Sequence, residues 1–182
     1  MKKLWSVIAL LALSLGGAAA LRAQDPGALQ QETRLLPQLV GEWDYVSQLV
    51  VEAGKPPLES RGTERVRAVG ACWVVAESES KGAGGTYTGV MTVGYDARKQ
   101  KHMATFIDSL TTHMTIYEGG SLDERGRTLT LLGEAPGPGG TIAKYRCVIE
   151  RKGRDQRTLT SAIQLADGTW ADFLSIRYTR KR

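Results

Sequence analysis

Hydrophobic and polar residues alternate along most of this chain after about Gly41, in short stretches that end at turn-forming residues. A period of two indicates β-strands with one buried face and one solvated face. The breaks between the stretches are clusters of Gly, Pro, Asp and Lys, which favour turns. The pattern predicts strands at Gly41–Glu52, Ser60–Val69, Cys72–Ser80, Tyr87–Tyr95, His102–Asp108, His113–Glu118, Thr128–Gly133, Thr141–Arg151, Arg157–Leu165 and Trp170–Thr179.

The spacing of these strands predicts an all-β fold, an antiparallel up-and-down meander of about ten strands closed into a barrel. Asp167-Gly168, between the last two strands, is a strong signal for a hairpin. No segment of helical period separates the strands, so parallel β-α-β units are not expected. A β-sandwich built from the same strands stays open as the alternative.

The alternation also predicts which side chains point into the barrel. The expected inner face of the first strand carries Trp43, Tyr45, Ser47, Leu49 and Val51. The inner face of the eighth strand carries Ala143, Tyr145, Cys147 and Ile149, and that of the last carries Trp170, Asp172, Leu174, Ile176 and Tyr178. The fifth strand stays undecided between the face of His102, Ala104, Phe106 and Asp108 and the face of Met103, Thr105 and Ile107.

A short helix is expected before the strands, between about Gln24 and Gln38. Asp25-Pro26 suits a helix start, and Pro37 limits how far the helix extends. Its leucines (Leu29, Leu35, Leu36 and Leu39) fall on one face, which is expected to cover one end of the barrel. The predicted organisation is residues 1–20 as a signal peptide, 21–38 as a short leader and 39–182 as the barrel.

The N-terminus has the three parts of a cleavable export signal. Met1-Lys2-Lys3 is basic, Leu4 to Leu15 is apolar, and Gly16 to Ala20 consists of small residues. The apolar run is too short to span a bilayer comfortably, so an uncleaved anchor is the weaker alternative. Cleavage is expected after Ala20, with Ala23 as the second choice, and export to the periplasm or out of the cell follows.

The net charge of +5 overstates the basic character of the exported protein, because Lys2 and Lys3 leave with the signal. The remaining basic residues are scattered among acids rather than gathered beside aromatic residues. Proteins that bind nucleic acid concentrate positive charge on one face. A nucleic-acid partner is therefore not expected.

The two cysteines, Cys72 and Cys147, would meet an oxidising compartment after export, where a disulfide is allowed. Two buried, unbonded thiols are the favoured alternative, because free cysteine is among the most buried residue types. Two cysteines alone do not build a structural zinc site.

Candidate chemistry is sparse. His102 and His113 flank the turn between the fifth and sixth strands, where they could face each other and form a polar cluster with Asp108. Surface or structural roles are commoner for two histidines without a tight motif, and Asp108 equally suits a turn cap before Leu110. No serine-hydrolase elbow, zinc-protease motif or phosphate-binding loop is present. We therefore predict no catalytic residue, metal ligand or cofactor, and enzymatic activity stays the alternative to binding.

The aromatic inner face favours a cavity that binds a small, mainly apolar molecule. Its expected lining is Trp43, Tyr45, Phe106, Asp108 and Tyr145. Trp43 is also expected to close one barrel end beneath the guanidinium of Arg177 or Arg180. A filled interior stays open as the alternative, as does a structural or interaction protein whose partner docks on the rim.

Several short motifs carry a resemblance to known families. Gly41-Glu42-Trp43 at the start of the first strand, with Tyr178 and Arg180 near the end, resembles the lipocalin or calycin plan. The further segments are Gly94-Tyr95-Asp96, Phe106-Ile107-Asp108-Ser109, Gly119, Leu129-Thr130-Leu131, Gly133-Glu134 and Ile176-Arg177-Tyr178-Thr179-Arg180. In this order, from about Leu39 to the end, they resemble the DUF1579 family of uncharacterised proteins.

The resemblance implies a lipocalin-like barrel and no particular activity. The nitrobindins, a related calycin-like group, bind haem through a histidine inside the barrel. Neither His102 nor His113 lies near the C-terminal end, where that ligand is expected, so the haem site is not carried over.

Overall fold

The computed structural model describes residues 26–182 except 53, 83–84 and 138–139. The predicted signal peptide and both predicted cleavage points lie outside the described residues. Within the described part of the chain, no helix is long and apolar enough to cross a membrane.

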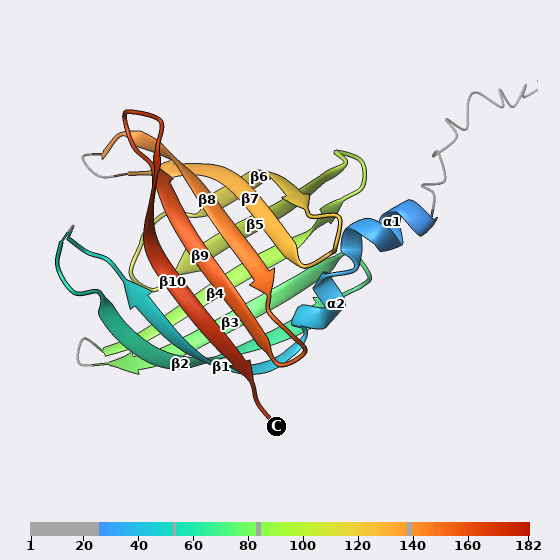
Figure 1. The fold of residues 1–182 in the computed structure, drawn as a ribbon, viewed down its shortest axis with the longest axis horizontal. Coiled ribbons are helices and arrows are strands. Elements are labelled where there is room, and N and C mark those ends of the chain that lie inside the picture. Colours follow the sequence, from blue (N-terminus) through green and yellow to red (C-terminus); the bar gives the residue numbers. More distant parts are fainter. Residues whose placement is uncertain (1–25, 53, 83–84, 138–139) are drawn as a thin grey trace, which may run out of the picture.

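Ten antiparallel strands form one closed barrel, in which each strand pairs with its neighbours in sequence and β1 pairs with β10 (Figure 1). Pairing of Trp43 with Arg180 and of Leu49 with Leu174 completes the closure. The predicted all-β, up-and-down barrel is confirmed, and the sandwich alternative is wrong. The strands are β1 (Gly41–Leu49), β2 (Leu58–Val69), β3 (Trp73–Gly82), β4 (Gly85–Asp96), β5 (Lys101–Asp108), β6 (Thr115–Leu122), β7 (Thr128–Pro136), β8 (Ile142–Arg151), β9 (Gln156–Gln164) and β10 (Trp170–Arg180).

Strand β6 shows the largest shift from its predicted bounds. It begins at Thr115 instead of His113 and continues through two glycines, Gly119 and Gly120, to Leu122. These glycines still pair with β7, after a β-bulge between Tyr117 and Gly119. The sequence pattern places a break at the glycines, because isolated strands are weakened by glycine.

Two short helices, α1 (Pro26–Thr33) and α2 (Leu36–Leu39), cover one end of the barrel (Figure 1). Leu35, Leu36 and Leu39 are almost fully buried there. The indole of Trp43 donates a hydrogen bond to the carbonyl oxygen of Leu39 at 2.9 Å. Arg180 donates two more, to the carbonyl oxygens of Val40 at 2.7 Å and Gln38 at 2.8 Å. The helices therefore form a fixed floor, which we call the closed end.

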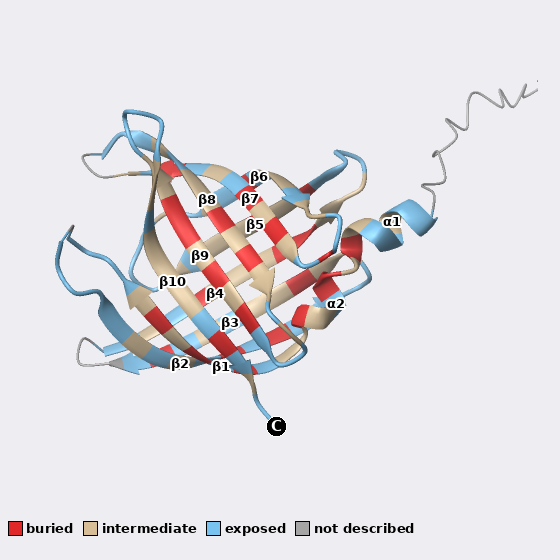
Figure 2. Cartoon of the chain, viewed as in Figure 1, coloured by how far each residue is buried: buried red, intermediate tan, exposed pale blue. Residues whose placement is uncertain are grey.

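Buried residues alternate with more exposed ones along several strands, as the colours in Figure 2 show. Trp43 and Tyr45 in β1, and Cys147 and Ile149 in β8, lie on the buried inner face as predicted. The structure also decides which face of β5 points into the barrel. Its inner face carries His102, Ala104, Phe106 and Asp108, while Ile107 on the other face is 44% exposed.

The prediction for β10 is wrong before Leu174. A β-bulge lies between Asp172 and Leu174, so both Phe173 and Leu174 line the interior. One extra residue reverses the alternation, which moves Trp170 and Asp172 to the outer wall. Arg146 of β8 contacts both of them there, at 3.7 Å from the Asp172 carboxylate and 4.8 Å from the Trp170 ring centre.

Candidate functional site: the barrel interior

The barrel contains a cavity of about 350 Å³ above the closed end. It reaches the surface beside Thr111 and Pro136, two exposed residues at the opposite end, which we call the mouth. Four predicted residues line it: Tyr45, Phe106, Asp108 and Tyr145. Trp43 is absent from the lining, because it lies in the floor among the leucines of the closed end.

Most of the cavity wall is aromatic or aliphatic. The apolar and aromatic lining consists of Tyr45, Tyr87, Met91, Phe106, Tyr117, Ala135, Pro136, Tyr145, Cys147, Leu159, Phe173, Leu174, Ile176 and Tyr178. The polar lining consists of Glu64, Ser78, Asp108, Thr111, His113, Thr115 and Ser161. An apolar wall with a few placed polar groups is typical of small-molecule sites.

A buried ion pair joins Glu64 of β2 to Arg157 of β9. The two side chains are only 6% and 4% exposed. The Arg157 guanidinium also packs against two rings, 3.7 Å from the centre of Tyr178 and 4.8 Å from that of Trp43. This arrangement neutralises a carboxylate that lines the cavity, without placing the arginine in the cavity wall.

The Tyr178 hydroxyl completes this polar group by donating to the second oxygen of Glu64 at 3.3 Å. Burial, with the nearby negative charge of Glu64, raises the pKa of Tyr178 well above its ordinary value of 10. The phenol therefore stays protonated and remains a donor at neutral pH.

Glu64 and Arg157 are not among the residues predicted from the sequence, because both lie in stretches where charges of either sign follow one another. The signal that could have identified them is their place in the alternation of inward- and outward-facing positions along each strand. Glu64 shares the inner face of β2 with Val66, and Arg157 shares that of β9 with Leu159. A charged residue in phase with buried apolar residues needs a partner inside the fold.

At the mouth, one oxygen of Asp108 accepts hydrogen bonds from the backbone amides of Leu110 and Thr111, each at 2.8 Å. This is the predicted turn cap. His113 lines the cavity beside it. No Lys or Arg in the described part of the chain lies within ion-pair distance of Asp108.

The expectation that His102 and His113 face each other is wrong. Phe106 pairs with Thr115, so the register places His113 near Asp108 and His102 toward the closed end. His102 is 2% exposed there, and its Nε2 donates to the carbonyl oxygen of Glu32 at 3.0 Å. Among the described residues, no group of three or more His, Cys, Asp or Glu side chains could hold a metal ion.

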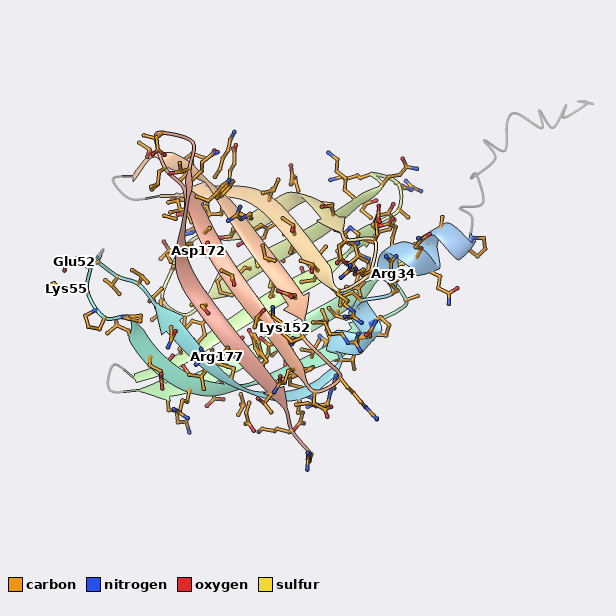
Figure 3. All side chains as sticks on the ribbon, in the orientation of Figure 1. Arg34, Glu52, Lys55, Lys152, Asp172 and Arg177 are labelled. Carbon is orange, nitrogen blue, oxygen red and sulfur yellow. The ribbon has the colours of Figure 1, made fainter. Side chains whose placement is uncertain are left out.

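Of the two arginines expected to cover Trp43, Arg180 does so, with its guanidinium 4.1 Å from the ring centre. Arg177 does not. It alternates with buried Tyr178 along β10 and is exposed on the outer wall, where Figure 3 labels it. The second guanidinium beside Trp43 is that of Arg157.

The disulfide considered for Cys72 and Cys147 is not formed. Cys72 lies at the closed end in the turn between β2 and β3, whereas Cys147 is buried on the inner face of β8. The side chains are held by different parts of the barrel wall, so a bridge would require the strands to move.

Burial raises the pKa of the Cys147 thiol to about 12, although a hydrogen bond with Ser161 opposes the shift. Only the thiolate reacts with alkylating agents, so Cys147 should be inert in the folded protein at pH 8. We expect iodoacetamide to modify Cys72 alone before unfolding and both cysteines in denaturant, as measured by peptide mass spectrometry. Equal rates for the two cysteines in the folded protein would contradict this.

A family model described as "Protein of unknown function (DUF1579)" matches residues 28–180. The chain is similar to the crystal structure of Rv2717c from M. tuberculosis, with a TM-score of 0.55 and 13% identity over 83% of this chain and 98% of that one. It is also similar to a redesigned β-barrel, mFAP1, bound to DFHBI, with a TM-score of 0.42 and 16% identity over 82% and 99% of the two chains. No protein with a curated description matches the chain. At these identities the likeness concerns the fold alone.

Proposed function

The chain belongs to the DUF1579 family of proteins of unknown function, and from this starting point we propose that it binds a small, mainly apolar molecule inside its barrel. The observation that carries the proposal is the cavity of about 350 Å³ with its largely aromatic wall. Small-molecule sites commonly have volumes of about 300–1,000 Å³. A barrel whose side chains filled the interior would leave no such space.

The positions of the polar groups favour binding over catalysis. General acid–base chemistry needs its groups within hydrogen-bonding reach of one another and of the substrate. His102 lies outside the cavity lining and is hydrogen-bonded to the carbonyl oxygen of Glu32 in α1. Asp108 and His113, by contrast, lie at the mouth. The polar groups that remain suit the orientation of a ligand within an apolar cavity.

Filling the cavity should weaken the binding of an apolar molecule without unfolding the barrel. Met91→Trp places a larger ring in the cavity lining, and we expect it to weaken the affinity for the neutral dye N-phenylnaphthylamine by about tenfold or more. Dye fluorescence measures the affinity, and circular dichroism checks the fold. Ile107→Trp, on the exposed face of β5, is the matched control and should bind as the wild type does. Equal affinity of the Met91→Trp protein would place the dye outside the cavity.

We also propose export to the periplasm or out of the cell. The proposal is supported by the basic start, the short apolar run and the small residues that end at Ala20. Expression of the full chain in a bacterial host, followed by cell fractionation and intact-mass measurement, tests it. The expected product lacks residues through Ala20 or Ala23 and lies outside the cytoplasm. An uncut chain in the cytoplasm would refute the proposal.

A further inference from the structure

The fixed charges in the cavity wall are both negative. Among the described residues that line the cavity, the carboxylates are Glu64 and Asp108, and none is Lys or Arg. His113 is the one basic side chain in that lining. The wall therefore offers no permanent positive charge to a ligand.

The guanidinium of Arg157, beside the cavity, is already paired with a carboxylate, although its buried Nε has no hydrogen-bond partner among the described residues. Arg157 bonds to Glu64 and packs against the rings of Tyr178 and Trp43, and it does not line the cavity. Its charge is matched by that of Glu64 before any ligand enters. A second anion at the floor would lack a counter-charge of its own.

At the mouth, the uncompensated charge is negative. The backbone amides of Leu110 and Thr111 occupy only one oxygen of Asp108. Its other oxygen accepts no hydrogen bond from the described residues and can accept one from a ligand hydroxyl or ammonium group.

Burying a carboxylate without a cation is costly, and a neighbouring like charge raises that cost. An alcohol avoids this penalty, and an amine is attracted to Asp108. From this charge distribution we infer that the barrel selects neutral or cationic amphiphiles and excludes anionic ones such as fatty acids. The inference rests on the proposed function, because it names the chemical class of that same ligand.

Three probe ligands with the same alkyl chain test the selection: decanol, decylamine and decanoate. Their affinities are measured by isothermal titration calorimetry at about pH 8, where the amine and the acid are both charged. We expect decanol and decylamine to bind, and decanoate to bind at least about tenfold more weakly than either.

A variant with a positively charged side chain added to the cavity wall should discriminate less against the anionic ligand. Thr115→Lys adds an ammonium group to the cavity lining, and we expect the preference for decylamine over decanoate to fall by about tenfold or more. Thr179→Lys, on the exposed outer face of β10, is the matched control and should leave the preference unchanged. Circular dichroism verifies that both variants fold.

The possible outcomes separate the two proposals. If decanoate binds the wild type as tightly as decanol, the charge selection is overturned while binding by the barrel stands. If none of the three ligands binds, the proposed function fails and the selection fails with it. If decanoate binds the wild type weakly, and its binding is strengthened by Thr115→Lys but not by Thr179→Lys, the result supports both ligand binding by the barrel and selection by charge.

Discussion

Replacement of Arg157 by methionine is expected to destabilise the barrel by about 3–5 kcal/mol, because it leaves a buried carboxylate without its cation. Glu64 is 6% exposed, and its remaining partners are the hydroxyls of Tyr178 at 3.3 Å and Ser78 at 3.5 Å. Neither hydroxyl supplies positive charge. The free energy of unfolding is measured by urea titration with tryptophan fluorescence as the signal.

Two controls separate the charge effect from loss of packing. Arg157→Met combined with Glu64→Leu removes both charges, and we expect it to recover most of the lost stability, since buried ion pairs are often replaceable by apolar side chains. Arg67→Met breaks an exposed pair with Glu77, at 3.9 Å, and should cost less than about 1 kcal/mol. If Arg157→Met also lost less than about 1 kcal/mol, that result would contradict the assigned role of the buried pair.

Trp43→Ala is the second large effect, with an expected loss of about 3–5 kcal/mol, as for other buried aromatic residues. Trp43 is 1% exposed and lies at the junction of β1, β10 and the helices. Its removal leaves a cavity and takes away the ring that Arg157 and Arg180 contact. It also removes the hydrogen bond to Leu39 that holds α2 on the closed end. Urea unfolding followed by circular dichroism measures the change.

Trp170→Ala is the matched control for Trp43→Ala. Trp170 is half-buried on the outer wall, where its ring contacts Arg146 at 4.8 Å. Less area is buried there, so the expected loss is below about 1.5 kcal/mol. If the two alanine variants lost equal stability, the closed end would not depend on Trp43 as proposed.

The number and order of the strands could be predicted from local pattern alone. Alternation depends on side chains two residues apart, and turn residues mark the end of each strand, so both signals lie within about a dozen residues. The inner positions of Trp43 and Cys147 follow from the same parity. The alternation fails at the bulge that moves Asp172 and Trp170 to the outer wall, and at Val51, which lies beyond the end of β1 and is 71% exposed.

The candidate site could be predicted only in part. Tyr45, Phe106, Asp108 and Tyr145 are found because they share a strand face with apolar neighbours. Glu64 and Arg157 are missed, since the two residues lie 93 positions apart in the chain. The alternation in each strand places both residues on the inner face, but no local pattern shows which buried charge pairs with which.

By itself, the sequence determined ten strands, their order, most of their inner faces and a helical cover, because these depend on period, turns and burial within short segments. Only the tertiary structure decided which charged groups meet, which histidine reaches the cavity and how much space remains inside. Register places Asp108 beside His113 and sends His102 to the closed end. Closure of β1 on β10 brings Trp43, Arg157 and Arg180 together, and such contacts exist only after distant strands have paired.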